Sequence, residues 1–89
     1  MTTHELKAWP MFFGPMSRGE KTFEIRKNDR RFAVGDTLFI REWDPARNIH
    51  TGNDMYRLVT YITDFPAGLR EGFVVMGLGP ALRECDRPE

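Results

Sequence analysis

Apolar and polar residues alternate in two segments near the start of the chain, and each alternation predicts a β-strand. Residues 4–7 place Leu6 between two charged neighbours, and residues 21–27 place Phe23 and Ile25 on one face. The opposite face of the second segment carries Thr22, Glu24 and Arg26. Because successive side chains of a strand point to opposite sides, residues 21–27 are predicted to form a strand with one apolar and one polar face.

Three further segments have the composition of strands. Residues 37–43 carry apolar side chains on both faces, as expected inside a closed sheet, and residues 55–63 and 73–78 are rich in β-branched and aromatic residues. Residues 44–53 are mostly polar and begin with an Asp-Pro pair. This composition predicts a long hairpin loop between the strands at 37–43 and 55–63.

The segment between the first two strands is predicted to be a helix at 10–18. Pro10 suits the first helical position, and Gly19 suits the left-handed residue that follows a helix. Pro15 lies in the middle of this segment. Since an interior proline removes a backbone hydrogen bond, a kink or a split is expected there.

These elements predict the fold class α+β, with about five strands and one or two short helices in a single domain at 1–82. So many strands in so short a chain can cover their apolar faces only if the sheet curls or closes. We therefore expect a small mixed β-barrel with the helix across one opening. Residues 83–89 are polar and are expected to form a disordered tail.

Composition narrows the function classes. The 89 residues include 13 Lys and Arg, 13 Asp and Glu, and one cysteine, so no internal disulfide can form. His4 and His50 are far apart in sequence, and no metal-ligand spacing is present. The longest apolar stretch, 73–82, is too short for a membrane span, and no secretion signal is evident. We expect a cytoplasmic protein without a metal, a cofactor or a membrane partner.

The charge is unevenly distributed along the chain. Residues 1–31 hold seven Lys or Arg against four acids, whereas residues 32–89 hold six against nine. The excess lies at 18–31, where six basic residues face three acidic ones. A local basic segment on a neutral protein indicates an anionic ligand, although an ordinary solvated strand and turn would look the same.

The residues Gly19, Lys21, Glu24 and Arg26 form the pattern GxKxxExR at a helix end that enters a strand. This pattern resembles that of the ASCH domain, a member of the PUA-like fold. The likeness extends to a small bacterial and phage domain of unknown function in that superfamily, through the blocks HELKAWP (4–10), GEKTFEIRKNDRRFAVGD (19–36), REWDP (41–45), VTYITDFPAGL (59–69) and GFVVMGL (72–78). The resemblance implies a PUA-like β-barrel that binds RNA or a modified nucleoside.

The motif residues also indicate a binding site on chemical grounds. Glu24 and Arg26 are two apart on a strand, so both leave the same face, and Lys21 lies just before that strand. Cations beside a carboxylate suit a ligand that has both acceptors and an amino donor, as a nucleobase has. The structural alternative is a buried Glu24–Arg26 ion pair that only fastens the strand.

Aromatic and basic neighbours extend this candidate site. Trp9, beside Lys7, is the better candidate for stacking a base, whereas Trp43 is expected to pack under the hairpin loop. Arg30 and Arg31 stand in a turn and are candidates for phosphate contacts. The sequence thus predicts a ligand cleft between the first helix and the barrel, formed by Lys7, Trp9, Lys21, Glu24, Arg26 and Arg30.

Two other functions remain open. One branch of the ASCH superfamily is similar to an amidohydrolase acting on N4-acetylcytidine; Lys21 matches its lysine, but Glu24 stands where that branch has its threonine nucleophile. Lys21 and Glu24 are therefore the candidate catalytic residues, with Glu24 as a general base for water. No Ser-His-Asp set is evident, so binding without catalysis is favoured. The third possibility is a protein-interaction module.

Overall fold

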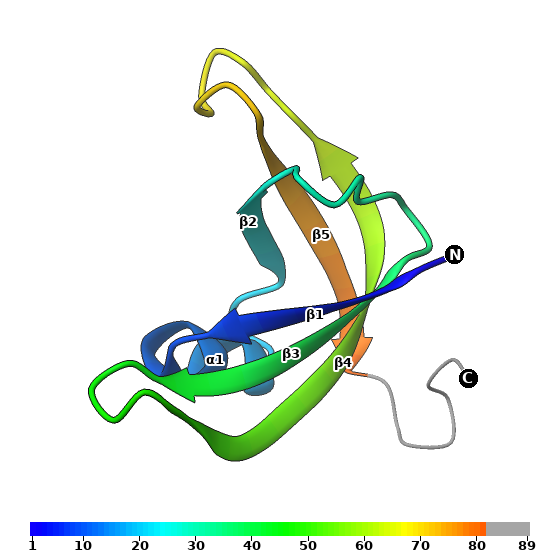
Figure 1. The fold of residues 1–89 in the computed structure, drawn as a ribbon. Coiled ribbons are helices and arrows are strands. Elements are labelled where there is room, and N and C mark those ends of the chain that lie inside the picture. The colour runs from blue at the N-terminus through cyan, green and yellow to red at the C-terminus, as the bar shows by residue number, and fades with distance from the viewer. Residues whose placement is uncertain (82–89) are drawn as a thin grey trace.

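The computed structural model describes residues 1–81, which form five strands and one helix (Figure 1). In chain order these elements are β1 (Thr3–Ala8), α1 (Pro10–Ser17), β2 (Phe23–Lys27), β3 (Thr37–Asp44), β4 (Ile49–Thr63) and β5 (Phe73–Ala81). All five predicted strands and the predicted helix are present. The expected disordered tail, 83–89, lies outside the described residues.

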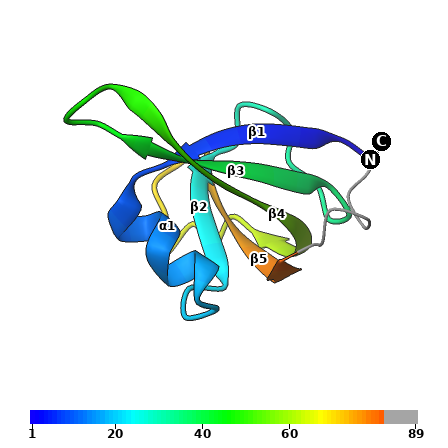
Figure 2. The ribbon, with the colours of Figure 1, turned by 90° about the horizontal axis from the view of Figure 1, so that it is seen from below.

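The strands form one curled sheet in the order β1-β3-β4-β5-β2. β1 runs parallel to β3, and the other neighbouring pairs are antiparallel. The sheet is therefore mixed, as predicted, but β1 and β2 stand at its two edges and do not pair with each other. Figures 1 and 2 show the sheet wrapping round so that these edges approach. The result is a curled half-barrel, open along one seam, which agrees with the expected small α+β fold with a curled sheet.

The concave side of the sheet holds the core. Alternate residues of β1 are buried, and the same alternation runs along β5. Two helical residues, Phe13 and Met16, complete the packing. The buried apolar set is Leu6, Ala8, Phe13, Met16, Phe32, Leu38, Ile40, Met55, Val59, Val74, Met76 and Leu78.

The helix α1 is one element that includes Pro15, so the segment is not split there. An eight-residue helix has few internal hydrogen bonds, and the carbonyl of Pro15 accepts from the backbone amides of Glu20 and Lys21 just beyond it. Gly19 ends the helix with a positive φ of 79°, as predicted. The chain then turns directly toward β2.

The predicted loop at 44–53 is mostly strand, because β3 runs to Asp44 and β4 begins at Ile49. The polar residues there pair across the hairpin instead of forming a loop: the Glu42 carboxylate accepts hydrogen bonds from Thr51 Oγ1 at 2.6 Å and Asn53 Nδ2 at 3.0 Å. Only residues 45–48 turn, and the Asp44 carboxylate accepts from the backbone amide of Ala46. The extended hairpin projects beyond the rest of the sheet (Figure 1).

Candidate functional site

A cavity of about 550 Å³ lies along the open seam, where the end of β1 and the start of α1 face β2. It is lined by Lys7, Ala8, Trp9, Phe12, Lys21, Phe23, Glu24, Ile25 and Arg26. Five of the six residues predicted to bind a ligand are in this set. The cavity also lies between the first helix and the curled sheet, which is where the sequence predicts the cleft.

Glu24 forms the polar centre of the cavity. Its Oε1 accepts a hydrogen bond from Lys21 Nζ at 3.0 Å, and its Oε2 accepts one from Arg26 Nε at 2.9 Å. Glu24 is only 6% exposed, while the two cations are half-buried. A buried carboxylate is tolerated here because a cation engages each oxygen. The Glu24–Arg26 ion pair of the structural alternative is thus present, with Lys21 as a third member.

The orientation of β2 explains why a carboxylate is buried. Glu24 lies opposite Met76 of β5, whose side chain belongs to the core, so the even-numbered residues of β2 point inward. The apolar residues Phe23 and Ile25 therefore point outward and are 43% and 48% exposed. In an isolated amphipathic strand the apolar face would be the buried one. β2 presents the reverse arrangement, and both Phe23 and Ile25 line the cavity.

Lys21 contacts Glu24 although odd- and even-numbered residues of a strand point to opposite faces. It precedes β2, in the segment that leaves the helix end at Gly19, so the alternation of the strand does not apply to it. Its Nζ also donates to the carbonyl of Phe23 at 2.9 Å and lies 4.7 Å from the centre of the Phe23 ring. Lys21 therefore links the polar centre of the cavity to its aromatic wall.

The opposite wall comes from the end of β1 and the start of α1. Trp9 is 49% exposed, and Phe12 of the first helical turn is also exposed. The two rings and Phe23 give the cavity a mostly apolar, aromatic lining. Lys7 contributes at the rim, with its Nζ 4.0 Å from the centre of the Trp43 ring. Trp43 packs edge-on against His50, its partner on the paired strand β4, rather than under a loop.

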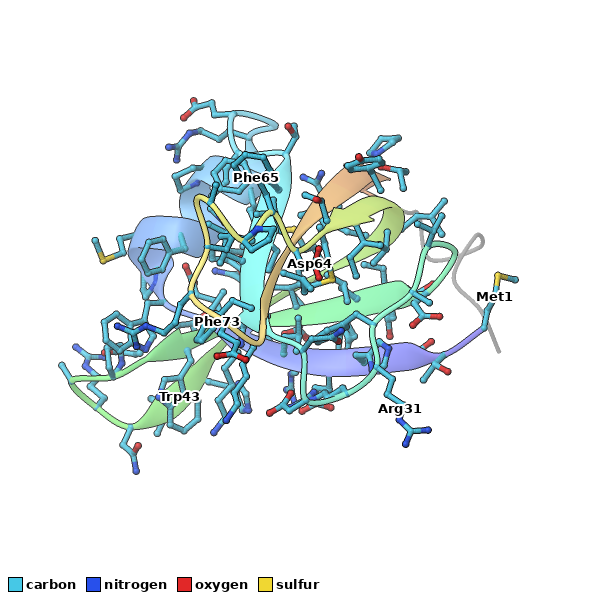
Figure 3. All side chains as sticks on the ribbon, turned by 90° about the horizontal axis from the view of Figure 1, so that it is seen from above. Met1, Arg31, Trp43, Asp64, Phe65 and Phe73 are labelled. Atoms are coloured by element: carbon cyan, nitrogen blue, oxygen red, sulfur yellow. The ribbon has the colours of Figure 1, made fainter. Side chains whose placement is uncertain are left out.

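Arg30 is the one predicted ligand-binding residue outside this cavity. Its Nη1 donates to the backbone carbonyl of Glu5 in β1, while Arg26 Nη2 donates to the carbonyl of Lys7. These two arginine side chains connect the sheet edges where no strand ladder exists. Arg31 adopts a positive φ of 52°, and Figure 3 shows its side chain directed away from the sheet.

Sequence reasoning missed two buried polar groups. His4 Nε2 lies 2.8 Å from Asp36 Oδ2, joining β1 to the turn before β3. Burial acts to raise the pKa of the Asp36 carboxyl, but hydrogen bonds from His4 and from the backbone amides of Thr2 and Ala33 outweigh it, so the pKa is lowered. The pattern of residues 4–7 could have located His4 on the buried face, but not its partner.

The second missed group is Arg57, which is buried in the inner face of β4. It donates to the carbonyl of Met16, at the end of α1, and to that of Gly79 in β5 at 2.9 Å. Burial lowers its pKa below the usual arginine value. The sequence could not predict that Arg57 is buried, because a single basic residue in a strand is ordinarily exposed to solvent.

Within residues 1–81, no three His, Cys, Asp or Glu side chains are grouped closely enough to hold a metal ion. No helix in this part of the chain is long and apolar enough to cross a membrane.

Comparison with known proteins places these features in a family. Residues 3–78 match a family described as "Domain of unknown function (DUF3850)", and the chain belongs to it. The chain is also similar to the "Uncharacterized 12.9 kDa protein in GpA 3'region" of Escherichia phage P2, with 34% identity over 68 residues. The matched region covers 76% of this chain and 61% of the phage protein, so the chain spans less than two thirds of that relative.

Proposed function

We propose that this member of the DUF3850 family binds RNA or a nucleotide, with one base held in the seam cavity. The observation that carries this proposal is an aromatic cavity of about 550 Å³ with the Lys21–Glu24–Arg26 cluster at its centre. Small-ligand sites are typically concave and mostly apolar, with a few convergent polar groups that fix orientation. The protein would act in the cytoplasm, where such ligands are abundant.

The aromatic lining suits the flat face of a base. Trp9, Phe12 and Phe23 all line the cavity and are all partly exposed. Stacking of a base on an aromatic side chain contributes about 1 to 3 kcal/mol and tolerates any base. Aromatic rings that stay open to solvent contribute little to the stability of the core. In the proposed complex they provide most of the binding energy for a planar ligand.

The polar centre suits the edge of the base. Lys21 has three N–H donors and uses two of them, on Glu24 and on the Phe23 carbonyl. Arg26 has five donors, of which those on Nη1 make no hydrogen bond within residues 1–81. The cluster therefore holds its own geometry and still has donors to offer to base carbonyl or ring-nitrogen acceptors.

The same observations support a PUA-like fold of the ASCH type as part of this proposal. The curled mixed sheet has a short helix between its first two strands, and the three charged residues of the GxKxxExR pattern line the cavity. A functional motif is expected to gather at a ligand site, and this one lies at the seam rather than in the core.

The direct test is an amide NMR titration of the labelled protein with a short mixed single-stranded RNA, at low and at physiological salt. We expect saturable shifts in residues 7–12 and 21–26. The Trp9→Ala variant should bind about tenfold more weakly, because it removes one stacking surface. Phe65→Ala is the matched control, since Phe65 is also an exposed aromatic but lies in the loop between β4 and β5 (Figure 3).

Equal binding by Trp9→Ala and wild type would remove the cavity from consideration. An absence of shifts in a folded sample would contradict RNA binding and would favour a protein partner instead. If the affinity depends on salt with a logarithmic slope of about −2 to −3, three or four phosphates are being neutralised. A salt-independent affinity would indicate recognition of the base alone.

A second candidate function is hydrolysis of an acetylated nucleoside. The observation that favours it is the 3.0 Å contact between Lys21 Nζ and a Glu24 oxygen beside the cavity. Against it, each Glu24 oxygen already accepts a hydrogen bond from a cation, so a water must compete for the remaining lone pairs before Glu24 can act as its base. Chromatographic assay of N4-acetylcytidine with wild type and Lys21→Ala decides the matter: turnover that disappears in the variant would establish hydrolysis.

A further inference from the structure

A second, smaller cavity adjoins the first along the same seam. It has a volume of about 250 Å³ and is lined by Leu6, Arg26, Lys27, Asp29, Arg30 and Phe32. Arg26 lines both cavities, so a single side chain separates them. The first cavity is aromatic and mostly apolar, whereas the second is lined mainly by charged groups.

The second cavity has an excess of positive charge. Arg26, Lys27 and Arg30 face a single carboxylate, that of Asp29. Arg26 is also paired with Glu24, so the two unpaired cations are Lys27 and Arg30. Within residues 1–81, the Lys27 side chain makes no hydrogen bond or ion pair, and Arg30 makes one bond, to the Glu5 carbonyl. Cations that converge without a carboxylate for each of them favour an anionic ligand.

We propose that this basic cavity binds the phosphate of a nucleotide whose base occupies the aromatic cavity. The inference rests on the proposed function, since it assigns the base to the first cavity. It adds where the phosphate binds, and it requires the phosphate to contribute to the affinity. Lys27 and Arg30 contact the phosphate, and Arg26 lies between the base and the phosphate.

The spacing along β2 fits this assignment. Ile25 lines the aromatic cavity and Lys27 lines the basic one. Residues two apart on a strand are separated by about 7 Å. A ribose must therefore span only about this distance to place a base and its phosphate in the two cavities, which share Arg26 in their lining.

The arginine links across the seam are compatible with a bound phosphate. Arg30 uses Nη1 for the Glu5 carbonyl, which leaves the other edge of its planar guanidinium available. The hydrogen bond from Arg30 to the Glu5 carbonyl can stay in place when a phosphate binds. This hydrogen bond holds the guanidinium at the cavity.

The test compares phosphorylated with unphosphorylated probes. We would titrate the labelled protein with 5′-AMP, 5′-CMP, 5′-GMP and 5′-UMP, with the four matching nucleosides, and with inorganic phosphate. We expect at least one monophosphate to bind about tenfold more tightly than its nucleoside, as one charge-assisted contact implies. Monophosphates should shift residues 26–32 in addition to the aromatic cavity, and nucleosides only the latter.

Two neighbouring variants provide a matched pair. Lys27→Gln removes a cation that lines the basic cavity, whereas Arg31→Gln removes one that points away from the sheet (Figure 3). Neither side chain makes a hydrogen bond within the described residues, so both variants should fold normally, which circular dichroism would verify. We expect Lys27→Gln to lose roughly threefold to tenfold in monophosphate affinity and none in nucleoside affinity. Arg31→Gln should change neither.

The outcomes separate this inference from the proposed function. Equal binding of nucleosides and monophosphates at residues 7–12 and 21–26 would overturn the phosphate site and leave the base site standing. Shifts confined to residues 26–32, with monophosphates and inorganic phosphate but no nucleoside, would support the phosphate site and overturn the base site. Equal losses in Lys27→Gln and Arg31→Gln would reduce the effect to general charge and overturn the site. A 5′-phosphorylated trinucleotide compared with 5′-monophosphates then distinguishes a chain end from a free nucleotide.

Discussion

The two sides of the curled sheet are held together by different forces. On the side of β3, β4 and β5, antiparallel ladders with a few register shifts join the strands over a core that contains Leu38 and Val59, both fully buried. On the side of the seam, β1 and β2 share no ladder, and two arginine side chains reach from the β2 side to carbonyls of β1. Backbone pairing supports the first side, and side-chain charges support the second.

This difference teaches why the candidate site lies where it does. A continuous ladder satisfies its backbone groups and leaves no space between strands, so it cannot admit a ligand. At the seam the two sheet edges are separated. The gap contains cations that have unused hydrogen-bond donors and aromatic rings that are partly exposed to solvent. Four predictions, arranged from the largest expected effect to the smallest, test this contrast.

The largest effect should come from the core of the paired side. Leu38→Ala should lower the free energy of unfolding by about 3 to 4 kcal/mol, because it removes a fully buried side chain and leaves a cavity. Ile25→Ala at the seam should cost less than about 1 kcal/mol, because Ile25 is already half in solvent. Urea denaturation measures both, and similar costs would show that the seam is packed like the core.

The next effect should come from Arg26, which belongs to the Lys21–Glu24–Arg26 cluster and also reaches across the seam to β1. Arg26→Ala removes hydrogen bonds to Glu24 and to the Lys7 carbonyl and should cost about 1 to 2 kcal/mol of stability. It should also weaken nucleotide binding. Arg26→Lys retains the charge but not the separate Nε and Nη2 donors that reach Glu24 and the Lys7 carbonyl, and we expect it to recover little of either property. Full recovery by lysine would show that charge alone matters here.

A smaller, pH-dependent effect should come from Asp36, which contacts His4 of β1. The folded-state pKa of Asp36 is below its unfolded value, so its contribution to stability is fully present above that unfolded value, near pH 4, and is lost as the pH falls through the folded pKa. Denaturation of wild type and Asp36→Asn between pH 2 and 6 should give curves that converge at the acid end. Curves that stay parallel would contradict the assignment.

The smallest effect on stability should come from Lys21. The Lys21–Glu24 ion pair is largely buried, but Arg26 still engages the Glu24 carboxylate when Lys21 is removed, so Lys21→Ala should cost only about 1 kcal/mol, yet it should clearly weaken RNA or nucleotide binding. Thermal denaturation and the NMR titration measure the two properties on the same sample. A large loss of stability with unchanged binding would show that the cluster only fastens β2.

Local patterns predicted most elements of this fold. The alternation in 21–27 and the apolar runs at 37–43, 55–63 and 73–78 all correspond to strands. The helix at 10–18 and its end at Gly19 were also predictable, because helix boundaries depend on proline and glycine preferences that act within a few residues. The GxKxxExR spacing likewise predicted which charged side chains gather beside the cavity.

Predictions failed where distant residues decide the outcome. The polar segment 44–53 is strand rather than loop because Glu42 on the facing strand accepts the hydrogen bonds of Thr51 and Asn53. The buried His4–Asp36 contact joins residues 32 positions apart, which no local pattern contains. Such pairings gain free energy only after the chain has folded, so composition alone cannot reveal them.

The sequence by itself determined the elements, their order and the identity of the charged cluster. Only the tertiary structure decided that Phe23 and Ile25 face solvent while Glu24 faces inward, and that β1 and β2 remain unpaired. The physical reason is that period-two alternation defines two faces of a strand but not which one is buried. Pairing of β2 with β5, in the register that places Glu24 beside Met76, makes that choice and opens the seam in which we place the ligand.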